Sequence, residues 1–266
     1  MTYYKGSTAD CALNVVRAGR RDRPLVVLAH AVGMDLTYWE HQFAALVSDY
    51  DVIAYDLRGH GKSSNCTAYD FPALAGDIAA VIAAAKNGPA HVVGLSVGGM
   101  VAQTFALSRP ELVRSLTLID TVCTFSDEVR APLRARADTV RFGGMGAILQ
   151  PTLERWFTAD FIARRPDVID RVVKTLLSAD TLVHAAMWDT IATLDVAPAL
   201  HAISAPILIL VGEKDPTTPP AASRAIAERI KQAQLSILPG VSHICTVEAP
   251  TAVNQKILEF LSTTSV

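Results

Sequence analysis

The chain has 266 residues, half of them hydrophobic, and a formal net charge of −2 at pH 7. This length and apolar content predict a large buried core and argue against disorder. The nearly neutral charge removes the electrostatic case for nucleic acid or an anionic membrane as a partner. No apolar run of the sequence reaches the roughly 18 residues that span a bilayer.

Four cysteines are scattered along the chain at positions 11, 66, 123 and 245, without a C-x-x-C pair or a histidine at metal-ligand spacing. This spacing predicts neither a disulfide framework nor a metal site. We therefore expect four free thiols in a reducing compartment. Because the N-terminus also lacks a secretory signal pattern, the default expectation is a cytoplasmic protein.

Short, almost continuously apolar runs alternate with longer helical patterns. The predicted strands cover residues 12–17, 25–29, 51–55, 91–95, 115–119, 206–211 and 235–238. The predicted helices cover residues 38–47, 71–85, 98–107, 221–231 and 252–261. Strands that are apolar on both faces must be covered by helices on both sides. The pattern therefore predicts an α/β fold with a mostly parallel central sheet flanked by helices, and 12–17 as an antiparallel edge strand.

The alternation stops between about residues 122 and 202, where the sequence is helical and rich in arginine. Prolines at 132, 151, 166 and 198 divide this stretch into short helices. A helical stretch between two strands of one sheet predicts an inserted cap. We expect a core formed by residues 1–122 and 202–266, and a helical cap formed by residues 123–201.

Residues 94–98, Gly-Leu-Ser-Val-Gly, match the pattern G-x-S-x-G between a predicted strand and a predicted helix. A serine at such a position lies on a sharp turn that exposes its hydroxyl, and the glycines avoid clashes there. The helix N-terminus also directs its dipole toward this serine. Ser96 is therefore the predicted nucleophile.

A serine hydroxyl needs a neighbouring base, and loops at the carboxyl ends of parallel strands are where such groups gather. His243 follows the last predicted strand and is the expected base among seven histidines. Asp215 follows the preceding strand, in the chain order Ser, Asp, His, and is expected to orient the imidazole. Glu213 and Asp120 are the alternative acids.

The oxyanion formed during acyl transfer needs two preplaced donors. We expect them to be the backbone N–H of Val97, which follows the nucleophile, and that of Val32, in the loop after the strand 25–29. No cofactor and no metal is expected.

With these residues assigned, nearly the whole chain resembles the α/β-hydrolase superfamily. The resemblance rests on the segments LAHAVG, AYDLRGHGKS, GLSVGGMVAQ, GEKDPTTPP and GVSHICTVEAP, in this order. Within the superfamily the chain is most similar to the 3-oxoadipate enol-lactonase group, through residues 35–39, 56–63 and 155–158, although it has AHAVG where the group has S-N-S-L-G. The resemblance implies cofactor-free opening of a five-membered enol-lactone that carries a carboxylate, in aromatic catabolism.

The predicted cap contains arginines at 130, 134, 136, 141, 155, 164, 165 and 171, any of which could bind a substrate carboxylate. Trp156 and Trp188 are candidate walls of the substrate pocket. The expected ligand is a small ester or lactone. Other hypotheses keep the triad but change the substrate: a general carboxylesterase, a hydrolase of carbon–carbon bonds in ring-cleavage products, or a cofactor-free perhydrolase. A non-enzyme alternative is a ligand sensor with slow turnover.

Overall fold

The computed structural model describes residues 2–8 and 10–264, and within them one eight-stranded sheet has the order β1-β2-β4-β3-β5-β6-β7-β8. The strands are β1 (Thr2–Ser7), β2 (Ala12–Gly19), β3 (Leu25–Ala29), β4 (Asp51–Tyr55), β5 (Ala90–Leu95), β6 (Val113–Ile119), β7 (Ile207–Gly212) and β8 (Ala233–Leu238). The strands β4, β3, β5, β6, β7 and β8 are mutually parallel. The strand β2 is antiparallel to both of its neighbours, β1 and β4. The predicted mostly parallel sheet is confirmed.

The six predicted parallel strands agree with the structure to within two residues at each end. Every residue of β3, β4, β5 and β7 is buried, which is why these strands are apolar without alternation. The predicted antiparallel strand at residues 12–17 is confirmed as β2, but the prediction that it forms the edge of the sheet is wrong. The strand β1 pairs with β2 from Thr2↔Arg17 to Ser7↔Ala12 and takes the edge position.

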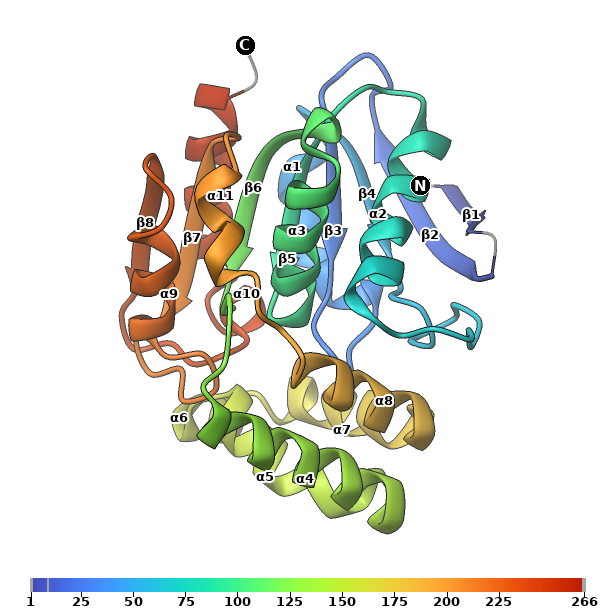
Figure 1. Cartoon of the computed structure of the whole chain (residues 1–266), viewed down its shortest axis with the longest axis vertical. Helices are drawn as coiled ribbons and strands as arrows, with labels where there is room; N and C mark the ends of the chain where they lie inside the picture. The colour runs from blue at the N-terminus through green and yellow to red at the C-terminus, as the bar shows by residue number, and fades with distance from the viewer. Residues whose placement is uncertain (1, 9, 265–266) are drawn as a thin grey trace.

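The helices of the core are α1 (Glu40–Leu46), α2 (Phe71–Ala85), α3 (Val97–Ser108), α9 (Pro220–Ala227), α10 (Cys245–Glu248) and α11 (Pro250–Thr264). Short 3-10 turns cover Leu36–Trp39, Pro110–Leu112, Met145–Ile148 and Ala197–Ala202. In Figure 1, α2 and α3 pack together in front of the sheet, and α1 and α11 pack together behind it. Both faces of the sheet are therefore covered, as its apolar strands require.

Five further helices follow β6: α4 (Asp127–Gly143), α5 (Leu149–Trp156), α6 (Ala159–Arg164), α7 (Pro166–Ser178) and α8 (Thr181–Ile191). They form a layer below the sheet in Figure 1, on the side where the chain leaves β6. Pro132 does not divide this region as expected, because it lies inside α4. Its ring is on the exposed side of that helix, where water can bond the carbonyl that a proline leaves unpaired.

A disulfide joins Cys11 to Cys66 across 55 residues of sequence, so the expectation of four free thiols is wrong. Pairing of β2 with β4 brings the two positions together, and the N–H of Ser64 donates to the carbonyl of Ala12 at 2.8 Å. Cys123 and Cys245 are buried free thiols. The cysteines therefore give no support for a reducing compartment.

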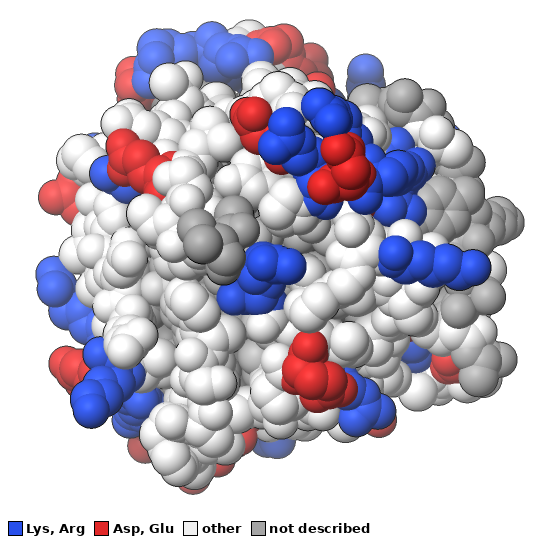
Figure 2. All heavy atoms as spheres, turned by 90° about the horizontal axis from the view of Figure 1, so that it is seen from above, with Lys and Arg blue, Asp and Glu red and all other residues white. Residues whose placement is uncertain are grey.

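The surface carries acidic and basic side chains side by side. On the face away from the helical layer, Figure 2 shows Lys and Arg interspersed with Asp and Glu, without one sign covering the face. Within residues 2–8 and 10–264, no helix is both long enough and apolar enough to cross a membrane.

Candidate active site

Ser96 lies between β5 and α3 in a left-handed backbone conformation, with φ 54° and ψ −116°. A non-glycine residue adopts this conformation only when its surroundings enforce it. Here the N–H of Ser96 donates to the carbonyl of Ile119 at 2.8 Å, and its own carbonyl accepts from the Thr121 hydroxyl at 2.8 Å. Both partners follow or end β6, so the neighbouring strand holds the turn in place.

The flanking glycines make this turn possible. A β-carbon at Gly94 would lie 2.3 Å from the carbonyl oxygen of Gly98, and one at Gly98 would lie 2.1 Å from that of Ala29. No larger residue fits at either position without moving backbone. The close approach of Gly98 to Ala29 also packs the start of α3 against the loop that follows β3.

The structure brings Ser96, His243 and Asp215 together from three loops that are far apart in sequence. The Nε2 atom of His243 lies 3.1 Å from Ser96 Oγ, and its Nδ1 atom lies 2.8 Å from Asp215 Oδ2. Ser96 is 6% exposed and His243 is 1% exposed. The distances are those of hydrogen bonds between a nucleophile, a base and an orienting acid.

The environment adjusts the proton affinities of these groups. Burial by itself lowers the pKa of His243, but the carboxylates of Asp215 and Asp120 outweigh it and raise that pKa above its ordinary value. Burial by itself raises the pKa of Asp215, but His243 and the hydrogen bonds from Thr218 lower it overall. The lowered pKa keeps Asp215 ionised beside an imidazole whose pKa is raised.

Asp215 is fixed by the turn that follows it. Its Oδ1 atom accepts from the N–H groups of Thr217 at 2.7 Å and Thr218 at 3.0 Å, and its Oδ2 atom accepts from the Thr218 hydroxyl at 2.6 Å. One carboxylate oxygen thus caps the turn, and the other faces both His243 and Thr218. The sequence analysis did not identify Thr218, although the Asp-Pro-Thr-Thr run is the signal for such a turn.

The two alternative acids have other partners. Glu213 accepts from the N–H of Gly240 at 2.8 Å at the surface. Asp120 is buried and accepts from the N–H groups of Gly212 at 2.8 Å and Cys245 at 3.2 Å. Burial and the nearby charge of Asp215 raise the pKa of Asp120 to about 7. Asp120 thus ties the end of β6 to both loops that carry Asp215 and His243.

Of the two predicted oxyanion donors, Val97 directly follows Ser96 as the first residue of α3. Val32 lies in the loop after β3, whose start packs against Gly98 of α3. That loop is held by His30, whose Nε2 accepts from the N–H of Leu57 at 2.9 Å and whose Nδ1 contacts the carbonyl of Ala31 at 2.8 Å. His30 is therefore a structural residue of the loop.

The end of α5 lies against the His243 loop, in what we call the α5–His243 contact, formed by residues 155–158 and 242–248. The carbonyl of Arg155 accepts from the Ser242 hydroxyl at 3.3 Å, and that of Trp156 accepts from the N–H of Ile244 at 3.0 Å.

Glu248 completes the α5–His243 contact. It accepts from the N–H of Ser242 at 2.9 Å, and from both the N–H and the hydroxyl of Thr158. Glu248 was not among the predicted site residues, because its partners lie 6 and 90 residues away in the sequence.

The two candidate pocket tryptophans lie in the helical layer. Trp156, at the end of α5, is buried and belongs to the α5–His243 contact. Trp188, on α8, donates a hydrogen bond from Nε1 to Nε2 of His184 at 3.0 Å. The guanidinium carbon of Arg136 lies 4.7 Å from the centre of the Trp188 ring. Trp188 thus has a packing role inside the layer, whereas Trp156 borders the loop of the candidate base.

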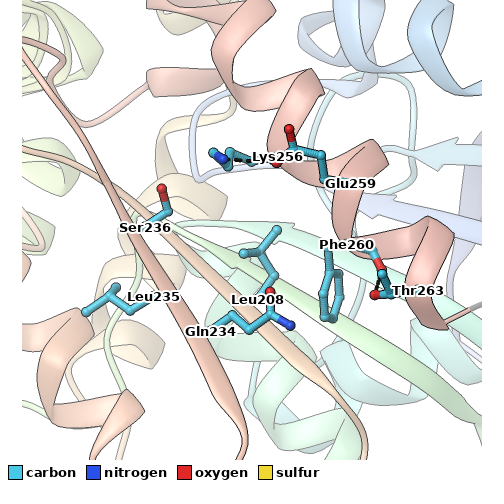
Figure 3. A pocket seen from close by; sticks show the side chains of 8 residues that line it. All are labelled: Leu208, Gln234, Leu235, Ser236, Lys256, Glu259, Phe260 and Thr263. Carbon is cyan, nitrogen blue, oxygen red and sulfur yellow. Dashed lines mark hydrogen bonds and ion pairs between the residues drawn. The ribbon is translucent and has the colours of Figure 1, made fainter.

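Two hollows of the structure lie outside the candidate triad. One of about 180 Å³, between the core and the helical layer, is lined by residues that include Gly33, His60 and Asp180. Another, of about 390 Å³, lies between β8 and α11; Figure 3 shows Leu208, Phe260 and the Lys256–Glu259 ion pair around it, without a triad residue. Among the described residues, no group of three or more His, Cys, Asp or Glu side chains is arranged to hold a metal ion.

Comparison with known proteins gives the same fold and the same kind of chemistry. Residues 26–256 match the model of the alpha/beta hydrolase family. The chain is 33% identical to 3-oxoadipate enol-lactonase 2 of Acinetobacter baylyi, over 93% of this chain and 92% of that protein.

Two solved structures of other proteins have the same fold as this chain. The enol-lactonase of Burkholderia xenovorans LB400 superposes with a TM-score of 0.90 at 31% identity, covering 95% of this chain and 97% of the other. A malate-bound thermophilic esterase of Thermogutta terrifontis superposes with a TM-score of 0.92 at 30% identity, covering both chains fully. On this evidence the chain belongs to the alpha/beta hydrolase family and is an enzyme that acts on ester bonds.

Proposed function

We propose that this enzyme opens a small lactone or ester through an acyl-enzyme, and that its substrate is 3-oxoadipate enol-lactone. The observation that carries the proposal is the hydrogen-bonded chain from Ser96 Oγ through His243 to Asp215. The enol-lactonase relatives from Acinetobacter and Burkholderia support the choice of substrate.

In the proposed mechanism, Ser96 Oγ attacks the lactone carbonyl while His243 Nε2 takes the hydroxyl proton. The N–H groups of Val97 and Val32 stabilise the oxyanion. When the ring carbon–oxygen bond breaks, His243 returns the proton to the leaving oxygen. A water molecule, deprotonated by the same imidazole, then attacks the acyl group and releases the acid and Ser96.

Asp215 keeps the imidazole in the tautomer that can accept a proton at Nε2, and it stabilises the imidazolium that forms. Thr218 and the N–H groups of residues 217 and 218 hold Asp215 for this role. We further propose the layer of residues 123–201 as the cap over the substrate, with Trp156 at the pocket wall. Trp188 supports that wall from within the cap.

We also propose a role in aromatic catabolism, which follows from the proposed substrate. A cytoplasmic location remains a prediction from composition, and the Cys11–Cys66 disulfide counts against it because reducing compartments disfavour such bonds.

The test is a turnover screen of 3-oxoadipate enol-lactone, simple γ-lactones and p-nitrophenyl esters, with Ser96→Ala as the blank. We expect the enol-lactone to give the highest kcat/KM, and Ser96→Ala to lower it by roughly 10⁴-fold or more. A p-nitrophenyl ester ranking first identifies a carboxylesterase instead. Saturable binding with negligible Ser96-dependent turnover identifies a ligand sensor.

A further inference from the structure

Most arginines of the helical layer are already engaged. Five form ion pairs with a neighbouring carboxylate: Arg130, Arg141, Arg164, Arg165 and Arg171. Arg136 lies over the Trp188 ring and donates to the Thr152 hydroxyl. Arg134 is exposed on α4, where water solvates its charge. None of these seven needs a ligand to balance it.

Arg155 differs from all of them. It is half-buried at the end of α5, and within residues 2–8 and 10–264 its guanidinium has neither an ion-pair nor a hydrogen-bond partner. The Nη2 atom in particular is buried and unpaired. Burial lowers the pKa of Arg155, which is the sign of a cation removed from water. An unpaired charged donor in such a place is costly unless a ligand supplies the acceptor.

The position of Arg155 relative to the triad is set by backbone contacts. Its carbonyl accepts from Ser242, and the carbonyl of the next residue accepts from the N–H of Ile244, so the end of α5 holds both neighbours of His243. These contacts place the helix end that carries Arg155 against the loop of the candidate base.

We propose that Arg155 binds a carboxylate of the substrate. A guanidinium presents two parallel N–H donors that match the two oxygens of a carboxylate. The end of α5 contacts both neighbours of His243, so a carboxylate held by Arg155 belongs to a substrate bound at the triad. This inference rests on the proposed function and assigns the residue that selects lactones or esters carrying a carboxylate.

The first experiment compares 3-oxoadipate enol-lactone with its neutral methyl ester in kcat/KM. We expect wild-type enzyme to prefer the acid, and Arg155→Gln to lower the acid-to-ester ratio by roughly 10²-fold, since each hydrogen bond to a charged group contributes about 1.5–3 kcal/mol. Arg155→Lys keeps the positive charge but lacks the two parallel N–H donors of a guanidinium. Its acid-to-ester ratio should therefore lie between those of wild-type enzyme and Arg155→Gln. Arg134→Gln removes an exposed arginine of the same layer and should leave the ratio unchanged.

The second experiment measures binding without turnover. By calorimetry, Ser96→Ala protein should bind adipate, and adding Arg155→Gln should weaken that binding by at least about tenfold. An unchanged acid-to-ester ratio in Arg155→Gln, or adipate binding that is absent or indifferent to Arg155, overturns the inference. If neither lactone is hydrolysed, the proposed function fails, and the adipate measurement still decides the role of Arg155.

Discussion

The hydroxyl of Thr218 donates to Asp215 Oδ2 at 2.6 Å, and the same oxygen lies 2.8 Å from Nδ1 of His243. Thr218 Oγ also lies 3.3 Å from Nδ1 of His243, so Thr218 contacts both the orienting carboxylate and the candidate base. Replacing it removes one donor from an acid that must stay ionised, without touching the nucleophile.

We predict that Thr218→Val lowers kcat/KM on the best ester or lactone by roughly tenfold, because one hydrogen bond to a charged group is lost. The pKa of Asp215 should rise, because the Thr218 side-chain hydrogen bond lowers it in the wild-type enzyme. Thr217→Val is the matched control, since Thr217 contributes only its backbone N–H to Asp215. Equal losses in both variants would mean that only the turn matters.

The pH dependence of kcat/KM should reflect the raised pKa of His243. Only the neutral imidazole can accept the Ser96 proton, so activity is lost as pH falls through this pKa. Because the folded pKa is raised, half-maximal activity should lie above the ordinary value of about 6.5. A half-maximal pH below about 6 in wild-type enzyme contradicts this expectation.

Asp120→Asn should move the same midpoint to lower pH, because Asp120 is partly ionised near its pKa of about 7 and its negative charge favours the imidazolium. Glu213→Gln is the control, because that side chain lies at the surface and bonds Gly240. Thermal unfolding of both variants separates this effect from damage to the loops that Asp120 joins. An unshifted profile in a stably folded Asp120→Asn enzyme rules out the electrostatic role.

Buried pairing of Arg58 with Asp77 should be important for stability. The guanidinium donates to both carboxylate oxygens, at 2.8 and 2.7 Å, and to the carbonyl of Ala68 at 2.6 Å. Asp77→Ala removes the buried carboxylate from Arg58 and leaves only the ion pair with Asp10 at 3.2 Å. It should lower the free energy of unfolding by about 3 kcal/mol, measured by denaturant titration. Asp22→Ala, which breaks an exposed pair with Arg20, should cause no measurable loss.

We also predict that the Cys11–Cys66 disulfide stabilises the folded protein. Replacing Cys11 and Cys66 by serine removes a cross-link that closes a 55-residue separation and should lower the free energy of unfolding by about 2–4 kcal/mol. Reductant should destabilise wild-type protein by a similar amount and leave the double variant unchanged. Denatured, unreduced wild-type protein should titrate as two thiols, Cys123 and Cys245. Four thiols would show that the bond does not form.

Sequence patterns predicted best the elements whose residues are buried on both faces. Runs such as LVVLA at β3 are apolar throughout because helices cover both faces, and their ends were predicted to within two residues. The three residues of the candidate triad could be proposed because each follows a parallel strand, and such strands end at one edge of the sheet.

Features that depend on pairing between distant segments left no local pattern. The edge strand β1 has no apolar run to mark it, and Cys11 meets Cys66 only through the pairing of β2 with β4. Likewise, Glu248 and Thr158 meet only because α5 lies on the His243 loop. The unpaired state of Arg155 became visible only once the partners of the other arginines were known.

The α5–His243 contact also has a consequence for engineering. Helical layers are attractive modules to exchange between relatives, but here the end of α5 holds the backbone on both sides of the candidate base. A chimera that imports a foreign α5 with the native 242–248 loop breaks bonds that position the imidazole. Exchanges that transplant residues 155–158 and 242–248 together should keep their turnover, whereas those that separate them should lose it.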